Sequence, residues 1–162
     1  MFTKFKDFFK QKEPKLDTRQ YYSNTGIREY TQEELDDNLF KSISTADYNT
    51  FTDMIKRGAN INKVENLDYE RTRSPLTNII YGWRYMERDR FKFLKVLFES
   101  GVNLFDYTEL GPEGTFEVDI YDSINKLVEP EYRQKTIDCL LKNYPNYMEE
   151  RELKMNVNKY NL

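Results

Sequence analysis

Apolar residues recur along this chain at the three- and four-residue intervals of amphipathic helices, in paired segments separated by short polar breaks. The pattern predicts three successive units, each a helix, a turn, a second helix and a turn that ends it. A single helix pair cannot bury its own stripes, so we expect neighbouring units to stack and share a core. The apolar positions are Leu39, Phe40, Ile43, Phe51, Met54 and Ile55 in the first unit, Leu76, Ile79, Ile80, Phe91, Phe93, Leu94, Leu97 and Phe98 in the second, and Ile120, Ile124, Leu127, Ile137, Leu140 and Leu141 in the third.

The turns between these helices carry signals of their own. Gly58 stands where a residue in the left-handed conformation commonly ends a helix. Gly101 and then Tyr144 follow it at equal intervals of 43 residues. Ser74 and Pro75 suit the cap and the first turn of the helix that opens the second unit. The even spacing indicates a repeat.

The run 56–62, Lys-Arg-Gly-Ala-Asn-Ile-Asn, resembles the end of the second helix of an ankyrin repeat, and residues 97–103 repeat it. Ser-Pro-Leu-Thr at 74–77 is similar to the Thr-Pro-Leu-His opening of the first helix. The resemblance covers roughly residues 35–148. It implies an all-α fold, an ankyrin-like α-solenoid of about three helix-turn-helix repeats with an N-terminal helical extension.

The chain also departs from the ankyrin pattern. An ankyrin unit has about 33 residues, whereas the period here falls in the range of HEAT and armadillo helix pairs. Thr77 replaces the histidine of the opening, and Tyr144-Pro145 replaces Gly-Ala in the third unit. A degenerate last unit is typical of a terminal cap, whose outer face meets water. The two ending motifs and the Ser-Pro-Leu opening favour the ankyrin interpretation.

The N-terminal segment has a helical stripe of its own, formed by Phe2, Phe5, Phe8 and Phe9, and Pro14 ends it. This segment could cap the first repeat, form a frayed leader, or touch a membrane surface through residues 1–12, although so short a helix binds lipid weakly. We divide the chain into a basic N-terminal segment and linker at 1–28, a repeat domain at 29–150 and a C-terminal tail at 151–162.

Composition excludes several kinds of chemistry. The chain has no histidine and a single cysteine, Cys139, so Ser-His-Asp and Cys-His catalysis, histidine-ligated zinc or haem, and an intrachain disulfide are excluded. We expect Cys139 to be a small buried residue. No apolar run approaches the ~20 residues of a membrane span and no signal peptide is present, which predicts a cytoplasmic protein.

Charge is distributed unevenly. Residues 1–28 have a balance of +4 and residues 29–162 a balance of −7, which gives a net charge of −3. An acidic body repels phosphate backbones, so we expect no nucleic-acid binding. It suits a basic protein partner, because complementary potentials steer association. The alternative is an acidic surface with no role beyond solvation.

We expect no catalysis, cofactor or metal. Carboxylates cluster at Asp36 and Asp37, at Glu149 and Glu150, and around Glu113, Glu117, Asp119 and Asp122, but none of these sets has a metal-loop pattern, and no phosphate-binding glycine loop is present. A carboxylate-based hydrolase is the alternative from the class of enzymes.

Three connecting segments are candidates for binding a partner. Tyrosine, tryptophan and arginine dominate binding hot spots, and all three occur in the segment that follows the first helix of the second unit. The alternative is that the aromatic rings of this segment pack on the next unit. The connection 106–119 is long and acidic, which is typical of either a binding loop or a variable surface loop. The equivalent connection one unit earlier is 66–71. The candidate residues are Tyr81, Trp83, Arg84 and Tyr85 in the first segment, Tyr107, Glu109, Glu113, Glu117 and Asp119 in the second, and Tyr69 and Glu70 in the third.

The resemblance implies a binding protein. Small, acidic ankyrin-like proteins occur among bacterial immunity proteins, which neutralise a cognate toxin. The Lys-, Asn-, Ile-, Tyr- and Phe-rich usage looks like that of an AT-rich bacterial or phage genome. We expect an inhibitor whose acidic face covers a basic toxin or effector enzyme. A phage inhibitor of a host defence enzyme and a scaffold or adaptor protein are alternatives.

Overall fold

The computed structural model describes residues 29–66, 72–82, 89–105, 107–111 and 114–160. The chain divides into two compact units, residues 1–30 and 31–162. Nearly all of the first unit, including the predicted N-terminal helix, lies outside the described residues. The fold below is that of the second unit.

The described part of the second unit is built mainly of helices, which confirms the all-α class. Three helix pairs lie where the apolar pattern predicts them, and a seventh helix follows. The helices are α1 (Gln32–Ser44), α2 (Tyr48–Lys56), α3 (Pro75–Tyr81), α4 (Arg90–Glu99), α5 (Ile120–Leu127), α6 (Pro130–Asn143) and α7 (Tyr147–Tyr160).

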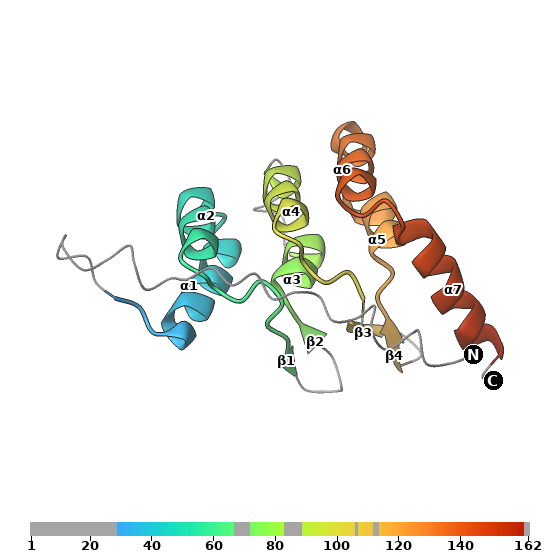
Figure 1. The fold of residues 1–162 in the computed structure, drawn as a ribbon, viewed down its shortest axis with the longest axis horizontal. Coiled ribbons are helices and arrows are strands. Elements are labelled where there is room, and N and C mark those ends of the chain that lie inside the picture. Colours follow the sequence, from blue (N-terminus) through green and yellow to red (C-terminus); the bar gives the residue numbers. More distant parts are fainter. Residues whose placement is uncertain (1–28, 67–71, 83–88, 106, 112–113, 161–162) are drawn as a thin grey trace. The chain divides into compact units, whose positions relative to one another are not determined.

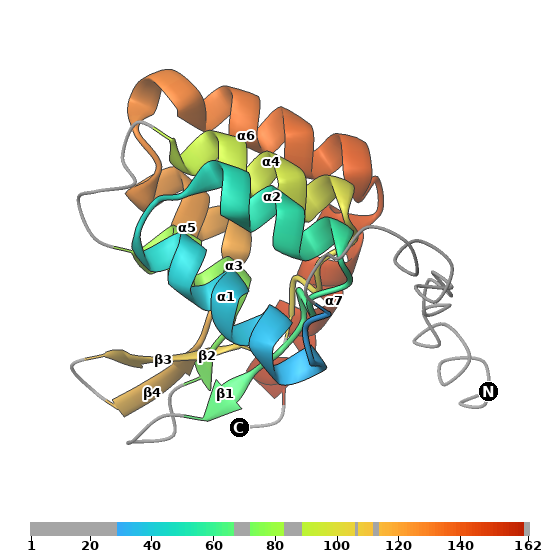
Figure 2. The same cartoon turned by 90° about the vertical axis from the view of Figure 1, so that its left-hand side faces the viewer.

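The helix pairs stand side by side in two layers. The first helices α1, α3 and α5 form one layer, and the second helices α2, α4 and α6 form the other (Figures 1 and 2). Contacts run from α1 to α3 and from α3 to α5 in the first layer, and from α4 to α6 in the second. Each pair is therefore supported by the next.

The connections that we expected to be loops contain two antiparallel hairpins on the side of the first helices (Figure 1). Strand β1 (Glu65–Asn66) pairs with β2 (Thr72–Arg73), and β3 (Thr108–Gly111) pairs with β4 (Gly114–Glu117). The two-residue strands are too short for the alternating pattern by which strands are identified in a sequence, and the four-residue strands lie at its lower limit.

The predicted stripes form the shared core. Phe51 of α2 and Phe93 of α4 are both fully buried, and their ring centroids lie 4.6 Å apart, which joins the first unit to the second. Leu97 and Ile124 are also completely buried. Four stripe positions are less covered: Leu127 is 39% exposed in the last turn of α5, and Ile55, Phe91 and Leu141 are partly buried.

The turn signals act as predicted. Gly58 and Gly101 have φ angles of 95° and 78°, the left-handed region that glycine enters without steric cost. Ser74 caps α3, with its Oγ accepting a hydrogen bond from the backbone N–H of Thr77. The Thr77 Oγ1 accepts one in return from the backbone N–H of Ser74 at 2.9 Å. Thr77, where the ankyrin opening has histidine, thus completes a capping box.

Side chains also join the turns of successive units. The Asn62 Oδ1 accepts a hydrogen bond from the backbone N–H of Asn103 at 2.6 Å, between the first and second units. The Tyr144 hydroxyl donates to the Val102 carbonyl at 2.7 Å, between the second and third. Tyr144 stands where the earlier units have glycine, so its ring gives the last unit a contact that glycine could not make.

Arg90 joins the other ends of the first helices. Its guanidinium is buried and donates to the carbonyls of Gly82, at 3.1 Å, and of Leu127. These carbonyls belong to the C-terminal ends of α3 and α5, where a helix has unpaired acceptors and its dipole favours a cation. Glu129 pairs with the same guanidinium at 3.2 Å.

Two details differ from the sequence analysis. The expected boundary between residues 150 and 151 lies inside α7, so the chain from 151 to 160 continues a helix and is not a separate tail. Cys139 is only partly buried. Burial nevertheless raises the pKa of the Cys139 thiol, with the nearby Glu99 carboxylate as a second cause.

The hydroxyl of Tyr144 provides a test of the contact between units. We expect Tyr144→Phe to lower the free energy of unfolding by about 1–2 kcal/mol, because the Val102 carbonyl loses this donor. Tyr132→Phe is the control, since the ring of Tyr132 stacks on Phe91 and retains that contact. Urea unfolding of both variants is the measurement, and equal stabilities would contradict a role for the Tyr144 hydroxyl.

Candidate functional site

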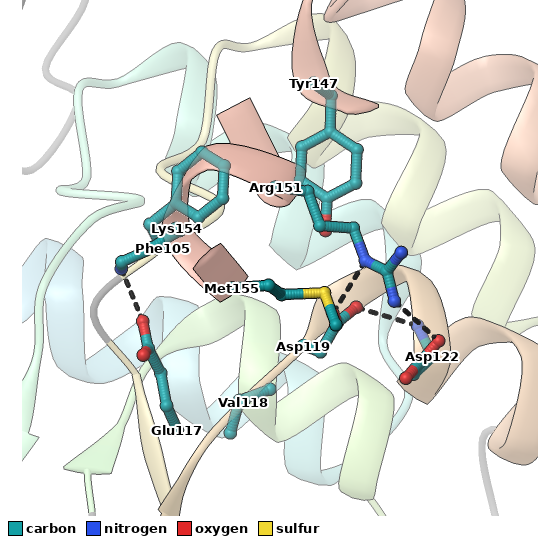
Figure 3. A pocket seen from close by; sticks show the side chains of 9 residues that line it. All are labelled: Phe105, Glu117, Val118, Asp119, Asp122, Tyr147, Arg151, Lys154 and Met155. Carbon is teal, nitrogen blue, oxygen red and sulfur yellow. Dashed lines mark hydrogen bonds and ion pairs between the residues drawn. The ribbon is translucent and has the colours of Figure 1, made fainter. Parts of the chain in front are cut away.

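A hollow of about 270 Å³ lies where β4, the start of α5 and α7 meet (Figure 3). It contains two of the predicted partner-binding residues, Glu117 and Asp119. The lining residues are Phe105, Glu117, Val118, Asp119, Asp122, Tyr147, Arg151, Lys154 and Met155. Charged and aromatic side chains therefore share one open surface.

Arg151 of α7 holds two of the carboxylates. Its Nε lies 2.7 Å from Asp119 Oδ2 and its Nη2 lies 2.9 Å from Asp122 Oδ1 (Figure 3). Asp119 is also the N-cap of α5, because its Oδ1 accepts a hydrogen bond from the backbone N–H of Asp122. The guanidinium lies 5.2 Å from the ring centroid of Tyr121. One arginine thus fixes the start of α5 against α7.

A second cation of α7 reaches the hairpin. Lys154 forms an ion pair with Glu117, the last residue of β4, and its ammonium lies 5.1 Å from the ring centroid of Phe105. The Phe105 ring stacks on Tyr147 with centroids 5.5 Å apart. Helix α7 therefore contacts the hairpin β3–β4 through charge and the segment before it through stacking.

Tyr147 is the buried aromatic residue of the hollow. Its hydroxyl accepts a hydrogen bond of 3.2 Å from the backbone N–H of Tyr121, in the first turn of α5. Burial, followed by the negative charge of Asp119, raises the pKa of Tyr147 above its ordinary value. The phenol therefore stays neutral well into the alkaline range.

The ion pairs of α7 can hold the hairpin β3–β4 and the start of α5 in place. Glu117, Asp119 and Asp122 each pair with Arg151 or Lys154. Within the described ranges, no group of three or more cysteine and acidic side chains is placed to hold a metal ion. None of the helices in these ranges is both long and apolar enough to cross a membrane.

Two predicted contact residues have other roles. Tyr107 is fully buried and its hydroxyl donates to the Asn103 carbonyl at 2.8 Å, so its prediction as a contact residue is wrong. Its acidic neighbours suggested an exposed loop, whereas the ring fills the core. Tyr81 is half-buried and shares a 2.9 Å hydrogen bond with Ser123 of α5. Tyr81 therefore packs on the next unit, which is the alternative stated for that segment.

The remaining predicted residues divide between the hairpin and undescribed parts of the chain. Glu117 is exposed at the end of β4, and Asp119 is partly exposed beside it. The backbone of Glu109 pairs with Phe116 in the hairpin β3–β4. Trp83, Arg84, Tyr85, Tyr69, Glu70 and Glu113 lie outside the described residues.

Sequence analysis missed the α7 side of the hollow. Arg151 and Lys154 are three residues apart, a spacing that places two side chains on one face of a helix. Their positive charges are opposite to those of the acidic group at 113–122, and this could have indicated ion pairs between the two segments. The repeat pattern ends before residue 151, and on that ground the sequence predicts a tail at 151–162.

Comparison of the chain with models of protein families, with curated proteins and with solved structures found no match.

The ion pairs of Arg151 can be tested by removing its charge. We expect Arg151→Gln to lower the free energy of unfolding by about 1–2 kcal/mol, because the Arg151 side chain is only 16% exposed and its guanidinium bonds two carboxylates. Hydrogen exchange should become faster along α7. Lys95→Gln, which removes an exposed pair with Glu99, should cost less than about 0.5 kcal/mol and serves as the control. Unchanged exchange in α7 would show that Arg151 does not hold the helix.

The buried phenols predict an alkaline limit to stability. Burial raises the pKa of Tyr144 as well as that of Tyr147, whereas both ionise near 10 in the unfolded chain. The folded state therefore binds these protons more tightly, and stability is complete below about pH 10 and falls as the pH rises above that value. Urea unfolding as a function of pH measures this loss. The double variant Tyr144→Phe, Tyr147→Phe should have a flatter profile, and an equally steep one would refute the assignment.

Proposed function

We propose that this chain is a non-catalytic, ankyrin-like protein-binding module that inhibits a protein partner, and that it serves as an immunity protein against a cognate bacterial toxin. The observation that carries the proposal is the hairpin β3–β4, an acidic connection held beside the first-helix layer by Lys154 of α7. A surface fixed in this way loses little conformational entropy when it binds.

The hairpins support the ankyrin-like interpretation of the repeat. An ankyrin unit consists of a β-turn and two helices. The hairpins β1–β2 and β3–β4 stand between successive helix pairs, where such turns are expected. Gly58 and Gly101 end the second helices in the left-handed conformation, in agreement with the motifs on which the resemblance rests.

Charge supports a basic partner. The connection 106–119 contains five carboxylates and no lysine or arginine. Residues 29–162 have an excess of seven negative charges, which steers a basic surface toward the chain. A basic toxin or effector enzyme meets this requirement. We also propose a cytoplasmic location, because a lone cysteine is typical of a reducing compartment.

The direct test is rescue of cells from a toxin. We expect a pull-down from the source cell, followed by mass spectrometry, to recover one basic enzyme encoded beside this gene. Co-expression of the chain should then restore growth to cells that produce that enzyme. A partner among host defence proteins would replace the immunity role with that of a phage inhibitor. Turnover of a substrate by the chain alone would contradict the proposal.

The predicted aromatic contacts give a second test. We expect Trp83→Ala or Tyr85→Ala to weaken binding of the recovered partner by at least about tenfold, because such residues dominate hot spots. Tyr132→Ala, on α6 in the layer of second helices, should leave the affinity unchanged. Raising the salt concentration should slow association, since it screens the acidic surface. Full affinity in both variants would exclude this segment from the interface.

A further inference from the structure

A second concave surface lies between α1, the hairpin β1–β2 and α3. This groove has a volume of about 320 Å³. Its lining residues are Asp37, Phe40, Lys41, Ser44, Glu65, Arg73 and Asn78. None of them belongs to the hollow beside α7.

Arg73 of β2 is held in one orientation but donates no hydrogen bond within the described part of the chain. Its guanidinium carbon lies 4.6 Å from the ring centroid of Phe40. Its Nε is 3.3 Å from Glu65 Oε2, an ion pair without a hydrogen bond, since Nε is buried with no hydrogen-bond partner. The side chain is 41% exposed. Stacking on the ring fixes the orientation of the planar guanidinium, and a guanidinium fixed in this way can donate hydrogen bonds to a carboxylate.

Two further donors line the same groove. Lys41 is exposed on the last turn of α1, and Asn78 is half-buried on α3. Among the described residues, neither the Lys41 ammonium nor the Asn78 amide has an ion-pair or hydrogen-bond partner. Three donor side chains from three separate elements therefore meet at one concavity with their hydrogen-bonding capacity unused.

The charge of the groove selects among anions. Asp37, whose side chain is 67% exposed, and Glu65 offset the positive charges of Lys41 and Arg73 within the groove. Lys63 at the edge of the groove lies 3.8 Å from Asp37 and 4.0 Å from Glu65, and its charge is offset in turn by the buried Asp36 at 3.7 Å. A neutral groove gives no long-range attraction to a phosphate dianion or to a nucleic-acid backbone, whose binding needs a positive field. It fits one carboxylate at Arg73 and Lys41, together with a cation near Asp37.

We propose that this groove binds a segment of the protein partner in which a glutamate or aspartate lies close to a lysine or arginine. Arg73 and Lys41 receive the carboxylate, Asn78 donates a further hydrogen bond, and Asp37 accepts the neighbouring cation. This proposal rests on the proposed protein-binding function and adds the chemistry of one contact surface. It also explains how an acidic chain can select among basic partners, since the groove requires an acid at one place.

The test uses the full chain and a library of random peptides. We expect selection on the immobilised protein to enrich peptides that carry an acidic residue next to a basic one. For the tightest of these peptides, Arg73→Ala and Lys41→Ala should each raise the Kd by about tenfold or more, the loss expected for a hydrogen bond to a charged group. Arg73→Lys should recover only part of the affinity, because lysine lacks the planar fork. Lys95→Ala, which removes an exposed side chain of α4 away from the groove, should leave the Kd unchanged.

The outcomes separate this proposal from the proposed function. Lys41→Ala keeps the test valid if Arg73→Ala fails to fold, because the Lys41 side chain is exposed and unpaired within the described residues. Selected peptides without acidic enrichment, an unchanged Kd in both variants, or displacement of the peptide by duplex DNA or inorganic phosphate would overturn the groove assignment. If the chain still captured and inhibited its basic enzyme, the proposed function would stand without the groove.

Discussion

Each helix pair in this protein depends on its neighbour for burial, and the other features follow from that constraint. Phe51 and Phe93 come from different units, and the two fully buried rings pack against each other. A two-helix unit alone would leave such rings in water, at a cost of about 1.5–3 kcal/mol each. Stacking therefore stabilises the fold, and the glycine turns, helix caps and Asn62 bond only fix where each pair begins and ends.

The same constraint explains why the last unit differs from the others. Within the part of the chain that the structure describes, α5 and α6 are followed by a single helix, α7, which contacts this end of the stack through Tyr147, Arg151 and Lys154. These three side chains have polar groups at their ends, which suits a surface that is partly exposed to water. Because Lys154 reaches Glu117, the element that ends the stack also positions the hairpin β3–β4.

The helices could be predicted from sequence because their information is local. Apolar spacing, the glycine turn at 58 and the Ser74 cap all lie within a few residues of the structure that they specify. The links that Arg90 makes to Leu127 and Arg151 makes to Asp119 could not be predicted, since these partners lie more than thirty residues away and nothing local selects them. Tyr107 was misjudged for the same reason, because its acidic neighbours are visible in the sequence and the core around it is not.

In the proposed binding mode, the two surfaces act at different ranges. The excess negative charge of residues 29–162 acts over about 8 Å in physiological salt, before any contact is made. The groove at Arg73 has balanced charges, so it contributes only once a carboxylate is within hydrogen-bond distance. Net charge then governs the association rate of any basic protein, whereas Arg73, stacked on Phe40, governs the dissociation rate of the matching one. Selectivity in this chain is therefore a property of its neutral surface, because its acidic surface attracts every basic protein alike.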